Sequence, residues 1–164
     1  MKIVIAYYSR SGNTKEIANL LKEKLKEKKV NTDIIEIESE KRPGFFRAGR
    51  AGMKQIELPI KNSTFDFKDY DLAFCGMPTW AGCPAPLYKT FLKKSKNFKN
   101  LKVAVFMTCA GPIDKNSRAI DFFKNEIQNM GLKTLDESIS FQMKKGKIND
   151  GEQEIDKFIE AITK

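Results

Sequence analysis

The chain has 164 residues, 41% of them apolar, and its 30 Lys and Arg residues outnumber 21 Asp and Glu residues to give a formal charge of +9. This length and apolar content exclude a disordered chain and predict a single domain over residues 1–164 with a sizeable core. The sequence has no histidine and no C-x-x-C spacing among its three cysteines, which excludes Ser-His and Cys-His catalysis and leaves any redox chemistry to an organic cofactor.

The first predicted strand runs from Lys2 to Tyr8, a β-branched and aromatic stretch that is typical of a central parallel strand. Apolar residues at helical spacing from Ile17 to Leu25 predict an amphipathic helix after it. The polar loop Ser9–Thr14 lies between them and therefore leads into a helix N-terminus. The first amide N–H groups of a helix lack internal partners and attract anions.

This loop carries short side-chain donors on both sides of Gly12, which favours a bound phosphate over an ordinary helix cap. Lys15 follows a lone glycine, so the Walker pattern of ATP-binding loops is absent, and the sequence has no G-x-G-x-x-G pattern. The loop therefore predicts a site for a small phosphate monoester. No catalytic side chain and no metal site are predicted.

The rest of the chain alternates between strand and helix patterns. A less buried strand is expected over Thr32–Ile37, followed by a long basic connection at about 41–63 that holds a short helix near Arg47–Gln55. The later expected elements are a strand over Asp71–Gly76, a helix with Leu87, Tyr88, Phe91 and Leu92 on one face, a strand over Leu101–Met107, a helix from Ala119 that ends near Gly131, a strand over Leu135–Phe141 and a helix over Ile155–Ile162.

This alternation predicts a three-layer α/β fold, a five-stranded parallel sheet with helices on both faces, and we expect the strand order 2-1-3-4-5. The loops after strands one, three and four then gather at the carboxyl edge of the sheet, where ligands bind in such folds. The N-terminal apolar run is too short for a secretory signal, and no stretch is long enough to span a membrane. A cytoplasmic protein without a membrane span is therefore expected.

Two motifs and the order of the elements resemble the flavodoxin-like FMN-binding family over nearly the full chain. The motifs are Ser-x-Ser-Gly-Asn-Thr after the first strand and Pro-Thr-Trp-Ala-Gly after the third. The resemblance implies that the first loop holds the FMN phosphate and that the second lines the isoalloxazine ring, with a third loop on its other side. The implied cofactor-binding residues are Ser9, Arg10, Ser11, Gly12, Asn13, Thr14, Pro78, Thr79, Trp80, Ala81, Gly82, Cys83, Thr108, Cys109, Ala110 and Gly111.

Trp80 is the sole tryptophan and lies in a loop rich in proline, which favours a cofactor contact over a place in the core. Ala81 follows it, so the peptide reorientation toward the flavin N5 atom that the family suggests is less free than with glycine. Cys83 and Cys109 are interpreted as small wall residues, because no histidine is present to activate a nucleophilic thiol.

The loop Thr108–Asn116 lacks the aromatic residue with which many flavodoxins cover the outer face of the flavin. Two functions therefore stay open. The favoured one is an FMN electron-transfer protein that shuttles electrons between redox partners, through an exposed flavin edge. The alternative is an FMN enzyme that reduces a quinone or a flavin with NAD(P)H delivered to the uncovered face.

The basic stretch 41–63 suggests a docking surface for an acidic redox protein near the cofactor, with a solvated insertion as the alternative. Phe45 and Phe46 lie among its arginines, so a nucleic-acid-binding module is a third interpretation. Nucleic acid is disfavoured as a partner, because no recognised binding motif accompanies the charge and the three flavin-like loops would have no role.

Overall fold

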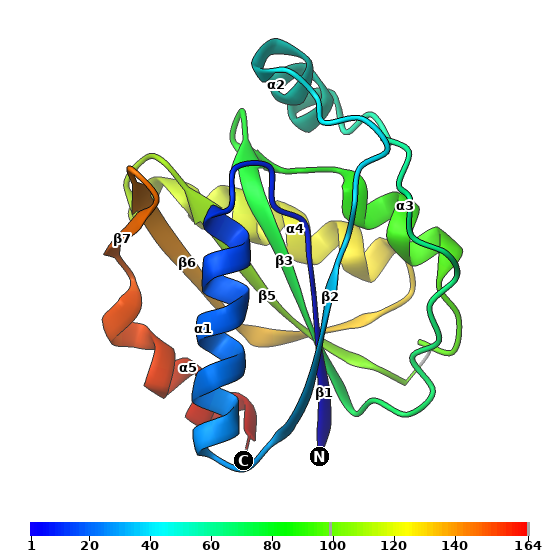
Figure 1. The fold of residues 1–164 in the computed structure, drawn as a ribbon, viewed down its shortest axis with the longest axis vertical. Coiled ribbons are helices and arrows are strands. Elements are labelled where there is room, and N and C mark those ends of the chain that lie inside the picture. Colours follow the sequence, from blue (N-terminus) through cyan, green and yellow to red (C-terminus); the bar gives the residue numbers. More distant parts are fainter. Residues whose placement is uncertain (99, 164) are drawn as a thin grey trace.

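A twisted sheet forms the centre of the computed structural model, which describes residues 1–98 and 100–163 (Figure 1). Its parallel strands lie in the order β2-β1-β3-β5-β6, which confirms the predicted order of five parallel strands. Their bounds are β1 Lys2–Tyr7, β2 Asn31–Glu36, β3 Leu72–Trp80, β5 Lys102–Cys109 and β6 Lys133–Lys144.

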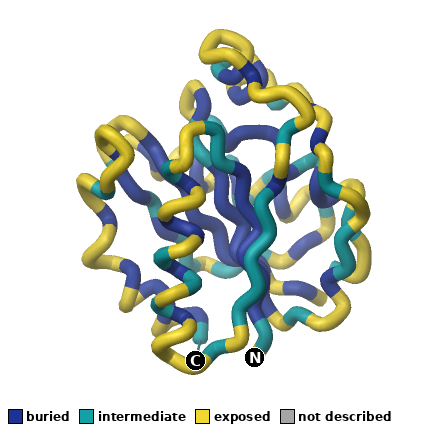
Figure 2. The backbone as a smooth tube through the Cα atoms, viewed as in Figure 1, coloured by how far each residue is buried: buried dark blue, intermediate teal, exposed yellow. Residues whose placement is uncertain are grey.

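Helices cover both faces of this sheet, as the alternation predicts (Figure 1). One face packs against α1 and α5, and the other against α3 and α4. The helix bounds are α1 Asn13–Glu27, α3 Leu87–Lys94, α4 Ser117–Asn129 and α5 Ile155–Thr163. The strands between these layers are largely buried, whereas the outer helix surfaces are exposed (Figure 2).

Strand β1 shows why the sequence forms a central strand. Ile3 and Ile5 point into the core beneath α1 and α5, while Val4 and Ala6 point into the core beneath α3 and α4. Successive side chains of a strand alternate between faces, so only a continuous apolar run satisfies a strand that is covered on both. Strand β2 lies at the sheet edge and is only partly buried from residue 32 to 36, as expected from its mixed sequence.

Two short antiparallel additions were not predicted. Strand β4, Cys83–Pro84, pairs with the end of β3, and strand β7, Lys147–Asp150, pairs with β6. Strand β3 also continues past the predicted end at Gly76 as far as Trp80, because its residues keep pairing with β5 up to Pro78 and then with β4. Short 3-10 helices, η1 at Ile113–Asn116 and η2 at Glu152–Glu154, precede α4 and α5.

The basic connection between β2 and β3 contains helix α2, Phe45–Lys54, which confirms the predicted short helix with a start two residues earlier. Helix α2 stands beyond the carboxyl ends of the strands, above the loop after β1 and the β3–β4 hairpin (Figure 1). It is anchored by three small residues, Ala48, Ala51 and Gly52, which are buried. No helix among residues 1–98 and 100–163 is long and apolar enough to cross a membrane.

Candidate cofactor site

The loop after β1 forms a tight turn at the start of α1. Gly12 is the N-cap residue and has φ +96°, a left-handed conformation that glycine adopts without strain. Its backbone N–H donates to Ser9 Oγ over 3.0 Å. Within the described part of the chain, no side chain caps α1, and Ser11 and Gly12 are exposed. The first amide N–H groups of α1 are therefore available to an external anion.

Arg10 lies in the same loop, but its side chain turns toward helix α2. Its Nε donates to the backbone carbonyl of Pro43 over 3.0 Å, just before α2 begins. Arg10 is half-buried in this position. It therefore ties the predicted phosphate loop to the entrance of α2, a link between distant segments that the sequence does not indicate.

A buried hydrogen bond joins the first and third predicted loops. Thr14 Oγ1 and Thr108 Oγ1 lie 2.8 Å apart, and both residues are almost completely buried. A buried hydroxyl without a partner is costly, so this pair fixes the start of α1 against the end of β5. Beyond Thr108, the loop leaves the core, and Ala110 and Gly111 are exposed.

Trp80 lies at the end of β3 with only 8% of its surface exposed. Its ring packs edge-on against Tyr8, with ring centroids 5.6 Å apart. Gly52 of α2 covers its backbone so closely that an added Cβ would lie 2.5 Å from Trp80 O. The exposed part of this hairpin is therefore its tip, Ala81 and Gly82, rather than the indole ring.

Asn116 is a positioning residue that the sequence analysis missed. Its Oδ1 accepts from Thr79 Oγ1 over 2.8 Å, and its Nδ2 donates to Ser140 Oγ over 3.0 Å. Asn116 is buried, so both ends of its amide are used inside the protein. It lies outside both motifs, and the only signal in the sequence is its place ahead of an amphipathic helix, where asparagine often caps.

The tip of the β3–β4 hairpin uses two left-handed residues. Ala81 has φ +50° and Gly82 has φ +78°, the combination that a two-residue turn of type I′ requires. Alanine is strained in this region, whereas asparagine tolerates it. Ala81→Asn is therefore expected to raise the free energy of unfolding by about 0.5–1 kcal/mol, measured by urea denaturation. Gly82→Ala should lower it by about 1 kcal/mol, and the same sign for both variants would contradict this turn.

The three cysteines differ in burial and hence in reactivity. Burial raises the pKa of the Cys75 thiol to about 12 and that of Cys109 to about 11. Cys109 Sγ also donates to the carbonyl of Gly111 over 3.2 Å. Cys83, in β4, is partly exposed, and burial raises its pKa as well. None of these thiols is placed to act as a thiolate nucleophile, in line with their interpretation as wall residues.

This difference predicts a pattern of alkylation. At about pH 8, iodoacetamide should modify Cys83 first and leave Cys75 and Cys109 unmodified in the native protein, because a raised pKa keeps the thiol protonated and unreactive. In denaturant all three should react. Mass spectrometry of peptides from both samples measures the order, and early labelling of Cys109 would contradict its placement in the core.

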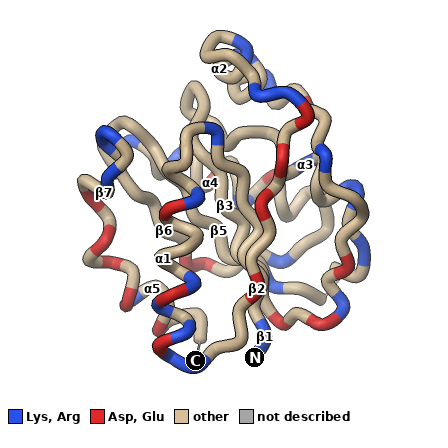
Figure 3. The backbone as a smooth tube through the Cα atoms, viewed as in Figure 1, with Lys and Arg blue, Asp and Glu red and all other residues tan. Residues whose placement is uncertain are grey.

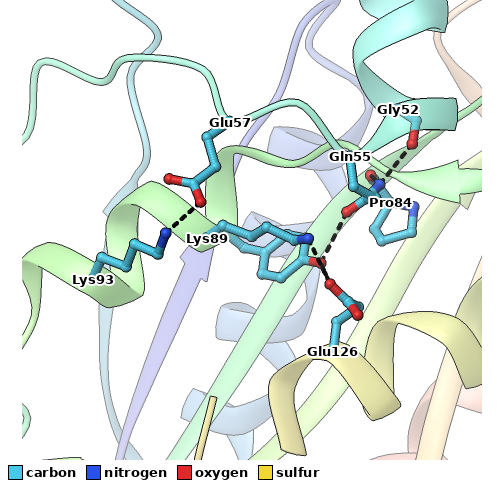
Figure 4. A network of polar contacts seen from close by, with 8 residues as sticks. Gly52, Gln55, Glu57, Pro84, Lys89, Lys93 and Glu126 are labelled. Atoms are coloured by element: carbon cyan, nitrogen blue, oxygen red, sulfur yellow. Dashed lines mark hydrogen bonds and ion pairs between the residues drawn. The ribbon is translucent and has the colours of Figure 1, made fainter. Parts of the chain in front are cut away.

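A polar network holds the C-terminal end of α2 beside the hairpin (Figure 4). Gln55 Nε2 donates to the carbonyls of Gly52, over 2.7 Å, and Pro84, over 2.9 Å. The hydroxyl of Tyr88 donates to Gln55 Oε1 over 3.0 Å, and burial raises the pKa of this hydroxyl. Glu126 of α4 lies 3.5 Å from the same hydroxyl. The network therefore links α2, β4, α3 and α4.

The three predicted loops thus meet at the carboxyl edge of the sheet. The Thr14–Thr108 bond joins the loops after β1 and β5, and the contact between Tyr8 and Trp80 joins β1 to the hairpin after β3. The exposed residues that these loops bring to the edge, Ser11, Gly12, Ala81, Gly82, Ala110 and Gly111, are small, and the uncapped first turn of α1 lies beside them. Thr14, Trp80 and Cys109 stand behind this surface in the core.

Comparisons with known proteins identify the family of the chain and match its fold. The family model described as flavodoxin matches residues 5–161. A flavoprotein from Lactobacillus acidophilus, solved in complex with FMN, is 25% identical, with 96% of this chain and 98% of that chain covered and a TM-score of 0.69. Flavodoxin 2 from Bacillus cereus is 22% identical over 99% and 98% of the two chains, with a TM-score of 0.64.

Flavodoxin 1 from Bacillus cereus, in its oxidised form, is 20% identical over 98% of this chain and 94% of that one, with a TM-score of 0.59. No curated protein matches the chain in sequence. The family match begins within β1 and continues through the other parallel strands and the loop after β1. The chain belongs to the flavodoxin family.

Proposed function

We propose that this chain is a cytoplasmic, single-domain electron-transfer protein that binds FMN. FMN is its cofactor, in agreement with the family and with the FMN complex of the similar flavoprotein from Lactobacillus acidophilus. The observation that carries the proposal is the free N-terminus of α1, where Gly12 adopts φ +96° and the described side chains provide no cap. Ser11 and Asn13 add side-chain donors beside these amides, which suits a phosphate monoester.

The ring of the cofactor would lie between the hairpin tip and the loop after β5. Ala81 and Gly82 offer backbone groups on one side, and Ala110 and Gly111 on the other. Small residues let the backbone approach a planar ligand closely, and backbone N–H and C=O groups fix its orientation. Thr79 and Cys109 then support these loops from behind through their internal hydrogen bonds. When bound, FMN supplies the electron-transfer chemistry, which the side chains of this protein lack.

The proposed partner is an acidic redox protein, because the net charge of +9 favours encounters with acidic surfaces.

A second candidate function rests on the loop after β5. Ala110, Gly111 and Pro112 are exposed and small, and none of them covers a flavin face. This opening favours, as the alternative, an enzyme that reduces a quinone or a flavin with NAD(P)H.

Spectroscopy and kinetics test the proposal. The purified protein, or the protein after addition of FMN, should show flavin absorption bands with one FMN per chain. Failure to bind added FMN would overturn the cofactor assignment. For an electron carrier, we expect NAD(P)H alone to bleach the flavin absorption slowly. A partner reductase should reduce the bound flavin fast. Rapid bleaching by NAD(P)H alone would instead establish the enzyme.

A further inference from the structure

Helix α2 and the residues just after it hold most of the exposed large apolar side chains in the described structure. In residues 1–98 and 100–163, every such side chain except Met1 lies between Phe45 and Ile56. Phe45 is 77% exposed, Phe46 is 90% exposed and Met53 is 61% exposed. A soluble surface rarely groups large apolar side chains in this way unless they bind something.

Phe46 and Met53 share the outward face of the helix, and Phe45 lies at its first position beside Phe46. The buried residues Ala48, Ala51 and Gly52 fix which side of α2 faces the protein. At 100° per residue, Phe46 and Met53 point in the opposite direction, since they are separated by two turns. Phe45 packs edge-on against Phe46, with ring centroids 5.8 Å apart. Helix α2 therefore carries an outward apolar crest, defined here as Phe45, Phe46 and Met53.

Positive charge surrounds this crest. Residues 41–56 contain five basic side chains and no Asp or Glu, and Figure 3 shows this run of Lys and Arg along α2 and its entrance. Within the described residues, none of the five forms an ion pair with an acidic side chain. They are Lys41, Arg42, Arg47, Arg50 and Lys54, and all are exposed. The segment is thus both apolar at its crest and strongly cationic around it.

We propose that α2 docks on an anionic lipid bilayer, with the apolar crest in the headgroup region and the surrounding Arg and Lys side chains against lipid phosphates. Interfacial helices combine aromatic residues on one face with Lys and Arg beside it, and each basic residue near an anionic surface adds attraction. Helix α2 projects from the body, so it meets a flat, deformable surface without obstruction (Figure 1). A second copy of the chain is disfavoured, because the same positive charges would face each other.

The proposal does not depend on the assignment of FMN, since no cofactor-site residue contributes to the crest. It adds a location for the proposed redox chemistry, because α2 stands on the same edge of the sheet as the phosphate-type loop (Figure 1). Docking through α2 would bring this edge toward the bilayer.

Co-sedimentation of the full, FMN-loaded chain with lipid vesicles tests this docking. We expect binding to vesicles of equal parts phosphatidylcholine and phosphatidylglycerol, little binding to phosphatidylcholine alone, and weaker binding as salt is raised. The double variant Phe45→Ala/Phe46→Ala should bind the anionic vesicles at least about tenfold more weakly, because it removes the apolar contact. Both side chains are exposed, so circular dichroism should show an intact fold.

The double variant Arg47→Gln/Arg50→Gln should also weaken vesicle binding, by about tenfold. The matched control, Lys26→Gln/Lys133→Gln, removes two exposed charges far from α2 in sequence and should stay within about twofold of the natural chain. Absence of binding to the anionic vesicles would overturn the proposal. Unchanged vesicle binding by Phe45→Ala/Phe46→Ala would also overturn it. If the natural chain does not bind the vesicles and Phe45→Ala/Phe46→Ala transfers electrons to an acidic protein more slowly, α2 would instead be a protein-docking surface.

Discussion

Ser11→Glu is expected to raise the Kd for FMN about 100-fold or more and to leave the Kd for riboflavin within about twofold. Ser11 is exposed beside the free amide groups of α1, where we place the phosphate. A carboxylate within a few ångströms of the phosphate costs about 3 kcal/mol at a partly exposed site, and this corresponds to about 100-fold in affinity. Riboflavin has the same ring but no phosphate, so the repulsion is absent.

Two features keep this experiment interpretable. A glutamate near the N-terminus of a helix is stabilising by about 0.5 kcal/mol, so the free protein should unfold at the same or slightly higher urea concentration. Ser11→Gln matches the size of the new side chain without its charge and should bind FMN nearly as well as the natural chain. Titrations that follow flavin fluorescence give both constants. Equal weakening of FMN and riboflavin by Ser11→Glu would place the phosphate elsewhere.

The part of the site nearest the first strand could be predicted because local sequence decides it. The apolar run from Ile3 to Tyr8 specifies burial on both faces, and the loop that follows must then lie at the carboxyl edge, directly before α1. Gly12 at φ +96° fits the same local logic, since a tight turn into a helix needs a residue that accepts a left-handed conformation.

The features that the sequence could not predict depend on an unusual turn residue or on contacts between distant segments. The β6–β7 hairpin turns at Lys145 and Gly146, which both have positive φ, yet a lysine is not a residue that signals such a turn. Asn116 acquires its role only when Thr79 and Ser140 are brought to it. Trp80 looks like a ring for cofactor contact in its local sequence, whereas Tyr8 and Gly52 enclose it in the fold.

Gly52→Ala is expected to lower the free energy of unfolding by about 2–3 kcal/mol, the largest loss we predict for a single methyl group in α2. The new Cβ would lie 2.5 Å from both Cβ and O of Trp80, closer than real contacts of this kind. Trp80 cannot retreat easily, because it is paired with Cys83 in the hairpin and packed against Tyr8. Helix α2 must therefore move, which also strains the bond from Gln55 to Pro84.

Gly49→Ala is the matched control, because Gly49 lies in the same helix and an added Cβ meets nothing within 4 Å. There the substitution should raise the free energy of unfolding by about 0.5–1 kcal/mol, since alanine favours a helix over glycine. Urea denaturation measures the opposite signs, and trypsin should cleave the Gly52→Ala variant faster at Arg47 and Arg50 because α2 is released. Equal stability of the two variants would mean that Gly52 does not pack against Trp80. Helix α2 would then not lie against the β3–β4 hairpin in the way described.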